Sequence, residues 1–475
     1  MSDVDVLIIG GGISGLSVAW WLAQNGIQSE VWEQDSRLGG KIHSHSSDGY
    51  LTEQAASLII NFRPEINQLL KATGLDEKKV TRSMKAGAHR YLFHNGKLQP
   101  VPSRPAEMLF SSLWSWQGKI RLLAEPFIPK GGGSNETVAG FISRRLGSEV
   151  LEKAMEPFVG GTLAADAGHA NAWATLPRLT ALEQRYGSIT MGILFNRLLR
   201  RRTAIINDAF SFQGGISTLV QALAATPACR IHTGRKTTGL AWDGSAWRVS
   251  GCSESEEFDL RARHVVISTP ANAAARLVHP LNNELGTTLG TIPYAPLAVI
   301  HMGFSQEQIS HPLDGSGFLT PADAGLAFNG NLWMSSLFPD RAPKGKALLS
   351  CYIGGCRAPQ MVNWKKQALA ATVCRDLKPI LGLRGEPEWL RIDRHQHALP
   401  LYHGNYQRRL SAIEQQLQRL PGLHLVANYK GGVSIRDRVL CGANTAKEIT
   451  QQLHKQRAGK TFFPAGMQRS PGYYS

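Results

Sequence analysis

Three glycines near the start of the chain have the spacing of a nucleotide-binding turn. The run Gly10-Gly11-Gly12-Ile13-Ser14-Gly15 contains the pattern GxGxxG and follows an apolar segment of strand length, residues 4–9. In such a turn the first glycine allows a sharp bend, the second lets the backbone approach a diphosphate, and the third lets the next helix pack closely on the strand. A helix-like segment, residues 16–25, directs its free N–H groups at the diphosphate. The spacing predicts a dinucleotide site.

Glu33 supports this prediction because it lies at the end of a second apolar strand. At that position of a nucleotide-binding unit, a carboxylate accepts hydrogen bonds from both hydroxyls of a ribose. The alternative interpretation is a glycine-rich surface loop. That alternative leaves the strand before the glycines, the helix after them and the distance to the acid unexplained.

A second glycine pair, Gly39-Gly40, follows Glu33 by a few residues and precedes Lys41. Alone, the pair is typical of a structural turn. Placed after the first motif, the segment 37–41 resembles the second glycine pair of FAD-containing amine oxidases, desaturases and protoporphyrinogen oxidases. In those families the backbone of the pair continues the diphosphate cradle. The resemblance therefore implies FAD rather than NAD as the cofactor, with Lys41 suited to the diphosphate.

The length of the chain, 475 residues, predicts two or three domains, because single cores stop growing well below that size. No segment reaches the roughly 18 uninterrupted apolar residues of a membrane span. The first strand begins within four residues of the N-terminus, which leaves no room for a signal peptide. We therefore expect a cytoplasmic protein.

The sequence does not predict a metal site. Its six cysteines are scattered without CxxC pairs, and its fifteen histidines show no HExxH spacing. Reduced, mostly packed thiols are the expected state of such cysteines in a cytoplasmic protein.

The chain is strongly basic, with 52 Lys and Arg against 36 Asp and Glu, a net charge of +16. Such an excess attracts nucleic acid, acidic lipid headgroups or a polycarboxylate substrate. No nucleic-acid motif appears, so nucleic acid is not an expected partner. The basic cluster at 197–202 is typical of a solvated surface. Because Met191, Ile193, Leu194 and Phe195 precede it, the segment also suits peripheral binding to an anionic membrane at its inner face.

The order of strand-like and helix-like segments predicts an α/β fold with a discontinuous Rossmann-like domain. Residues 231–250 alternate like a hairpin, residues 263–270 form a buried-type strand, and residues 271–278 suit a helix. We expect the FAD-binding domain in 1–85, 205–290 and 410–460, a hairpin plus a helical, substrate-facing segment in 86–204, a mixed-sheet substrate domain in 291–409, and a basic tail in 461–475.

Between residue 4 and about residue 449, the chain resembles the oxygen-dependent protoporphyrinogen oxidases. The resemblance is carried by blocks that are more specific than the glycine motif. These blocks are Asn95–Ser103, Arg144–Val150, Glu156–Asp166, Glu183–Ile189, Phe210–Gly215, Ile292–Val299, Ser336–Pro343 and Asn428–Val433.

The resemblance implies an FAD oxidase that dehydrogenates protoporphyrinogen IX to protoporphyrin IX in haem biosynthesis, with O2 as electron acceptor and H2O2 as product. Hydride passes to flavin N5, so no catalytic triad or paired acid is required. Alternatives remain at this point: oxidation of coproporphyrinogen III, a flavin amine oxidase, an isoprenoid desaturase, or a non-catalytic carrier. Members of the family include homodimers and membrane-associated proteins.

Site residues carried over from the resemblance lie in four segments. Arg90 matches a position that pairs with a substrate propionate, which a guanidinium binds with two parallel hydrogen bonds. Thr237 occupies the place where backbone contacts the adenine. The further cofactor contacts are Ala55, Ala56 and Ser57 near the flavin, and Gly432, Val433 and Ser434 near the C-terminus.

The chain also departs from the family at positions near the flavin. Ala55-Ala56 replaces a Gly-Pro pair, Ala427 replaces a glycine, and Arg438 replaces a cysteine. A methyl group where glycine is usual moves backbone away from a ligand or fills part of a pocket. These departures concern substrate identity rather than the diphosphate site.

Overall fold

Strand β1 (Asp3–Ile9), which precedes the glycine turn, lies inside a seven-stranded sheet with the order β10-β2-β1-β13-β12-β11, and β19 joins it on β13. The computed structural model describes residues 3–102, 107, 110–199 and 208–457. β1 pairs in parallel with β2 (Ser29–Trp32) and with β13 (Glu257–Ile267). The last four residues of β1 are buried, as expected for a parallel strand covered on both faces.

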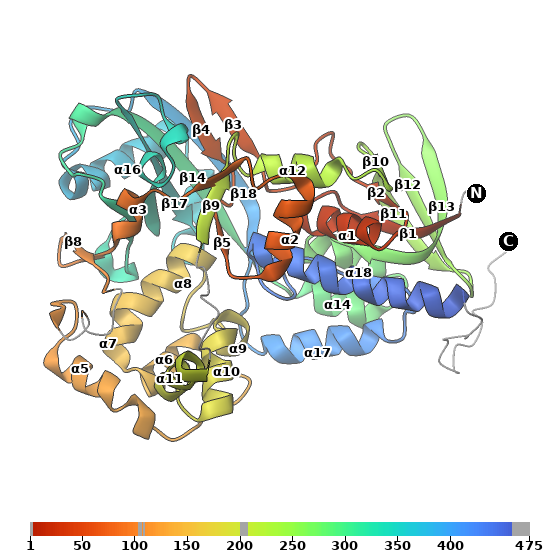
Figure 1. Cartoon of the computed structure of the whole chain (residues 1–475), viewed down its shortest axis with the longest axis horizontal. Helices are drawn as coiled ribbons and strands as arrows, with labels where there is room; N and C mark the ends of the chain where they lie inside the picture. Colours follow the sequence, from red (N-terminus) through yellow and green to blue (C-terminus); the bar gives the residue numbers. More distant parts are fainter. Residues whose placement is uncertain (1–2, 103–106, 108–109, 200–207, 458–475) are drawn as a thin grey trace.

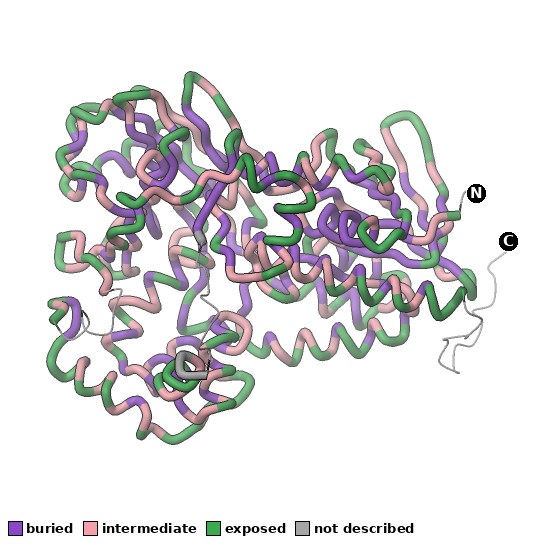
Figure 2. The backbone as a smooth tube through the Cα atoms, in the orientation of Figure 1, coloured by how far each residue is buried: buried purple, intermediate pink, exposed green. Residues whose placement is uncertain are grey.

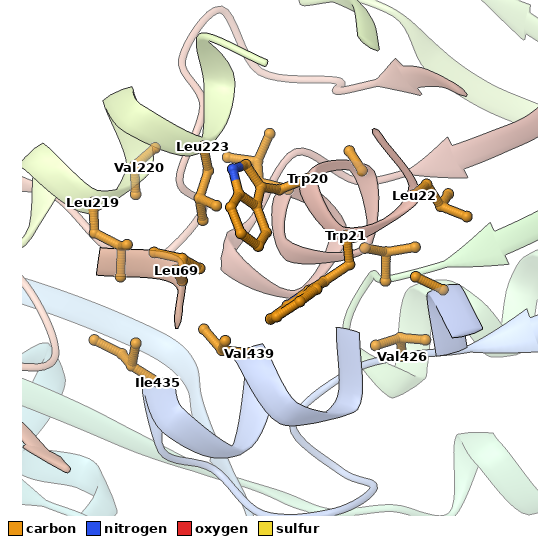
Figure 3. Close-up of a cluster of buried hydrophobic side chains, with 14 of the residues drawn as sticks. Trp20, Trp21, Leu22, Leu69, Leu219, Val220, Leu223, Val426, Ile435 and Val439 are labelled. Atoms are coloured by element: carbon orange, nitrogen blue, oxygen red, sulfur yellow. The ribbon is translucent and has the colours of Figure 1, made fainter. Parts of the chain in front are cut away.

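Helix α1 (Ile13–Gln24) begins at the glycine turn and packs beside α18 (Ile435–Arg457), the last described helix (Figure 1). Figure 3 shows Trp20 and Trp21 of α1 between Leu69, Leu223 and side chains of α18. The helices approach closely because Gly442 lacks a side chain, since a methyl group there would lie 2.4 Å from the Ser17 hydroxyl. One hydrophobic core therefore fixes both the glycine turn before α1 and the glycine-containing segment before α18.

The other strands of this sheet come from distant parts of the chain. The hairpin expected in 231–250 is formed by β11 (Lys236–Trp242) and β12 (Trp247–Cys252). β10 (Cys229–His232) pairs with β2, and β19 (Leu423–Leu425) pairs with β13. Helices α13 (Ala271–Val278), α14 (Asn283–Gly290) and α17 (Tyr406–Leu417) pack against β13 and its neighbours. The predicted discontinuous α/β fold is confirmed.

A second seven-stranded sheet has the order β18-β14-β17-β16-β15-β7-β8. Its strands are β7 (His89–His94), β8 (Lys97–Pro100), β14 (Tyr294–Ser305), β15 (Gly315–Leu319), β16 (Gly330–Trp333), β17 (Lys346–Gly354) and β18 (Trp389–Pro400). Helix α16 (Lys366–Leu381) packs on it. The hairpin predicted in 86–204 is formed by β7 and β8 and turns at Asn95-Gly96. We grouped this hairpin with the helical segment, but β7 pairs with β15 of the second sheet.

Short elements connect the two sheets. They are β3 (Ser44–Ser47) with β4 (Tyr50–Glu53), the sheet of β5 (Ile59–Asn61), β9 (Asp208–Phe212) and β6 (Lys79–Thr81), and helices α2 (Pro64–Thr73), α3 (Met84–Ala88), α12 (Ser217–Ala224) and α15 (Met334–Leu337). Figure 2 shows that buried backbone is concentrated in the strands of the sheets and in α1.

Residues 116–199 form a helical layer at the lower left of Figure 1. Its elements are α5 (Trp116–Leu123), η1 (Glu125–Phe127), α6 (Val138–Arg145), α7 (Ser148–Val150), η2 (Leu151–Met155), α8 (Glu156–Leu163), α9 (Ala172–Thr175), α10 (Pro177–Tyr186) and α11 (Ile189–Leu199). No helix in the described ranges is long and apolar enough to cross a membrane.

A buried charge cluster holds this layer together. The fully buried Arg145 guanidinium lies 3.4 Å from a Glu125 carboxylate oxygen and 2.7 Å from a Glu183 oxygen. Glu125 also accepts hydrogen bonds from the Ser188 hydroxyl and the Ile189 amide, at the start of α11. The cluster therefore joins η1, α6, α10 and α11.

We expect Glu125→Ala to lower the free energy of unfolding by about 3–5 kcal/mol, because the change leaves buried donors and part of the Arg145 charge uncompensated. Urea unfolding followed by circular dichroism measures this loss. Glu152→Ala, at an exposed position of the same layer, is the matched control and should change stability by less than about 0.5 kcal/mol. Equal effects of the two substitutions would contradict the role given to the cluster.

Candidate functional site

A cavity of about 1090 Å³ lies where the carboxyl ends of β1 and β13 meet the second sheet and α8. One half is lined by the glycine turns and the ends of the first sheet. The other half is lined by β14–β18 and by residues of α8. Ligands of open α/β sheets bind outside the carboxyl ends of the strands, so this position is that of a nucleotide cofactor.

The first glycine turn forms one wall of the cavity. Gly10 has φ 104°, a conformation that favours glycine, and Gly12 has open space where a side chain would be. Both line the cavity, together with Ile13 and Ser14. Gly15 does not line it, but a methyl group there would lie 2.1 Å from the Gly10 carbonyl oxygen. Gly10 therefore makes the bend, Gly12 leaves space for a ligand, and Gly15 allows the helix to pack closely on the strand.

Glu33 lies beside this turn and is buried, but it faces the cavity. One carboxylate oxygen accepts the Gly11 amide at 2.7 Å, and the other accepts the Asp35 amide at 2.9 Å. Desolvation raises the pKa of Glu33, and the backbone donors oppose that rise. The carboxylate is held rigidly and has acceptor capacity left for hydroxyl groups.

The second glycine pair continues the same wall. The Gly39 amide donates to the Gly11 carbonyl at 2.8 Å, and Gly39 and Gly40 both have positive φ. The Arg37 guanidinium donates to the Gly40 carbonyl at 2.6 Å and to the carbonyls of Leu38 and Ile42. Arg37 stands just before the glycine pair in the sequence, but the glycine motif does not predict that its guanidinium closes this turn.

Two buried hydroxyls in the wall lack partners. The Thr237 and Thr269 side-chain oxygens are buried without a hydrogen bond, and both residues line the cavity. Buried polar groups are almost always hydrogen-bonded, so these atoms fit a ligand with polar groups of its own. Ser268, at the end of β13, fixes the turn by donating to the Gly10 carbonyl at 2.7 Å. The wall therefore fits FAD, and the contact of Thr237 with the adenine stays a prediction.

Ala55, Ala56 and Ser57 line the cavity, as do Val433 and Ser434. Gly432 does not line the cavity, but its positive φ of 102° turns the chain just before Val433. The structure thus brings together all of the predicted cofactor segments.

Tyr352 of β17 and His395 of β18 line the cavity and join the second sheet to the segment 54–57. The Tyr352 and Ser57 hydroxyls are 2.8 Å apart, and burial raises the pKa of Tyr352 to about 12. The His395 Nε2 atom lies 2.9 Å from the Gln54 carbonyl, and burial lowers the pKa of this imidazole. Both side chains are therefore neutral at physiological pH. Neither was singled out in the sequence, because single residues on strands carry no motif.

The half of the cavity formed by the second sheet is mainly apolar. It is lined by Leu297, Val299, Phe318, Leu319, Leu332 and Leu399, with Gly161, Thr162 and Ala164 from the region of α8. Asn331 also lines it; its amide group donates to Cys351 at 2.9 Å, and its amide oxygen is buried without a partner.

Two of the predicted contacts concern Lys41 and Arg90. Lys41 lines the cavity, but its ammonium donates to the Ala398 carbonyl of β18 at 2.6 Å, and burial lowers its pKa to about 8. This bond directs Lys41 toward the second sheet. Arg90 is exposed on β7 and does not line the cavity, so its predicted contact with a substrate propionate stays a prediction.

Comparisons with known proteins agree with this architecture. The family model "Flavin containing amine oxidoreductase" matches residues 13–450. The mitochondrial protoporphyrinogen oxidase of Nicotiana tabacum is 29% identical over 484 residues, 94% of this chain and 95% of that protein. The coproporphyrinogen III oxidase of Bacillus subtilis (strain 168) is 27% identical over 457 residues, 91% of this chain and 95% of that protein. A crystal structure from Exiguobacterium sp. 255-15 has a TM-score of 0.78 at 23% identity, covers 95% of this chain and 100% of that chain, and shows the fold.

The chain therefore belongs to the flavin-containing amine oxidoreductase family. It is an FAD-dependent oxidoreductase, and the first glycine turn, Glu33 and the second glycine pair lie at one wall of a cavity that suits the nucleotide part of the cofactor.

We expect Glu33→Ala to raise the Kd for FAD by about 10- to 100-fold, because hydrogen bonds to a charged group are worth about 1.5–3 kcal/mol. Titration of the apoprotein with FAD, followed by flavin fluorescence, measures the affinity. Glu33→Gln keeps an acceptor for the Gly11 amide and separates loss of charge from damage to the turn.

Glu257→Ala removes an exposed acid at the start of β13, away from the cavity, and serves as the control. Its Kd for FAD should equal that of the unchanged protein. An unchanged Kd in Glu33→Ala would rule out the ribose contact.

Proposed function

We propose that the protein oxidises protoporphyrinogen IX to protoporphyrin IX. The observation that carries this proposal is the lack of charged side chains from the described residues of β14–β18 and α8 in the half of the cavity that these elements line. We call this half the substrate half. Among the described residues that line it from β14–β18 and α8, none is a lysine, an arginine or an acid, and the one imidazole, that of His395, is kept neutral by burial. That half suits an uncharged, mostly apolar part of a substrate.

Charge distribution separates the two porphyrinogens. Protoporphyrinogen IX carries two propionates on neighbouring rings, so its other rings can enter an apolar space without a charge. Coproporphyrinogen III carries a propionate on each ring, and an unpaired carboxylate is costly to bury. An amine is disfavoured for a related reason, since the acids lining the cavity, Glu33 and Asp35, belong to its nucleotide half.

Asn331 adds support for a pyrrole substrate. Its amide oxygen is buried, has no partner and lies in the cavity wall. Such an acceptor suits a pyrrole N–H donor, because a buried acceptor is costly to leave unpaired. Tyr352 and the apolar side chains around it exclude water and orient the ring.

When bound, FAD supplies the hydride acceptor. Because the conversion removes six hydrogens, we infer three two-electron cycles, in which three O2 take up the electrons and three H2O2 are released per porphyrin, a ratio that a peroxidase-coupled assay measures. The protein contributes orientation and a dry environment for the reacting carbon.

Anaerobic mixing of the FAD-loaded protein with each porphyrinogen tests the substrate. We expect protoporphyrinogen IX to bleach the oxidised flavin bands in a first two-electron step. Full oxidation to the porphyrin removes six electrons, so porphyrin fluorescence should appear only after O2 is admitted and reoxidises the flavin. The kcat/KM should exceed that for coproporphyrinogen III by about tenfold or more, since a buried unpaired carboxylate costs more than 1.4 kcal/mol. Equal or faster reaction of coproporphyrinogen III would overturn the assignment, and reduction by an amine or isoprenoid alone would indicate the related oxidases or desaturases.

We further propose that the protein acts in the cytoplasm, bound peripherally to an anionic membrane surface. Trp116, Ile120 and Leu123 occupy one face of α5, and each is more than 60% exposed. Phe127 of η1 is also exposed, and α11, with exposed Ile193, Leu194 and Phe195, packs against η1. We call these seven side chains the apolar patch. The side chains of the basic cluster at 197–202 lie outside the described residues.

The apolar patch suits insertion at the level of lipid headgroups. Lys119 lies over the Trp116 ring at 4.8 Å, which places a cation beside the apolar face of α5. An apolar face beside basic residues binds anionic bilayers through both buried area and charge.

The double substitution Ile120→Glu/Leu123→Glu should reduce binding to vesicles of phosphatidylglycerol and phosphatidylcholine by about tenfold, measured by co-sedimentation. Ile60→Glu/Trp364→Glu introduces the same charge at exposed apolar positions outside the apolar patch and is the matched control. If both variants lose binding equally, net charge and not the patch is responsible. If neither loses it, the patch does not bind membranes.

A further inference from the structure

Arg438 is a buried cation in the wall of the cavity. It lies in the first turns of α18, is 2% exposed, and lines the cavity with Ala427 and Val433. Among the described residues, no carboxylate lies within 4.0 Å of its guanidinium.

The contacts of Arg438 orient its charge without neutralising it. The guanidinium donates to the Ala427 carbonyl, and to the Lys430 carbonyl at 2.5 Å. It also lies 3.4 Å from the Cys441 sulfur, and its Nε atom is buried without a partner. Because an uncompensated buried cation is costly, a negative charge in the cavity would be favoured here.

The start of α18 adds to the positive potential of this wall. Ser434 and Ile435 line the cavity, and α18 begins at Ile435, so the positive end of the helix dipole is near Arg438. The nearby Asp437 carboxylate accepts the Ser434 hydroxyl at 2.5 Å and lies 3.7 Å from Arg436, so it is engaged elsewhere.

We propose that Arg438 stabilises negative charge on the reduced isoalloxazine ring of FAD and so raises the reduction potential of the bound flavin. When the ring takes up two electrons and one proton, it keeps one negative charge, whereas the oxidised ring is neutral. A fixed cation in the cavity wall favours the charged form. The inference depends on the flavin and not on the identity of the substrate.

The midpoint potential of the FAD-loaded protein, measured in equilibrium with a redox dye of known potential, tests the proposal. Arg438→Met removes the charge and should lower the potential by about 30 mV or more, a tenfold change in the equilibrium constant of a two-electron couple. Arg438→Lys keeps a charge but cannot bridge two carbonyls, so its potential should stay closer to that of the unchanged protein.

Arg394→Met is the matched control. Arg394 also donates to two backbone carbonyls, those of Val362 and Trp364 at 2.8 and 2.9 Å, but it does not line the cavity. The midpoint potential of the FAD-loaded Arg394→Met variant should equal that of the unchanged protein. An unchanged potential in Arg438→Met would overturn the proposal and leave Arg438 as a structural link of the loop 427–431. An equally large fall in Arg438→Lys would also overturn it, and this variant decides the matter if Arg438→Met does not fold.

Discussion

The close approach of α1 to the end of β1 is the constraint on which the rest of the structure depends. The helix can begin beside Gly10 only because Gly15 has no side chain, since the space for a methyl group there is already occupied by the Gly10 carbonyl. This contact places the first residues of α1, Ile13 and Ser14, in the cavity wall. Because α18 packs on α1, the same contact also determines where α18 lies relative to β1. The position of α18 in turn places Val433, Ser434 and Arg438 in the cavity wall.

The cavity joins two environments of different chemistry. Its nucleotide half is made of backbone turns, a fixed carboxylate and hydroxyls, which suit a polar and charged cofactor. Its other half is formed by side chains of a sheet that contributes leucine, valine and phenylalanine. A flavin cofactor spans such a boundary because one end is charged and the other is a flat ring. The protein does not need its own acid–base pair at this boundary, because the cofactor carries the reactive atom.

The sequence allowed the α/β class and the glycine turns to be predicted, because these depend on local backbone chemistry. Glu33 and most of the predicted cofactor residues line one cavity, and their contacts with FAD stay predictions. The direction of single side chains could not be predicted. Arg90 precedes Tyr91, and successive strand residues point to opposite faces, so a hairpin alone does not show which of them faces inward. Tyr91 packs near Trp333, and Arg90 is exposed. The bond of Lys41 to Ala398 joins residues too distant in the chain for any local pattern to reveal.

The pairing of α1 with α18 has a consequence for how the protein is made. The apolar face of α1, with Trp20 and Trp21, is covered by a helix that begins only at Ile435. At synthesis rates of about 5–20 residues per second, that face waits on the order of 20–80 s for its partner. During this interval α2 and α12 can already pack on the tryptophans, but the nascent chain lacks the α18 side of this core and one wall of its cofactor cavity. Flavin loading therefore becomes available only after α18 has been synthesised.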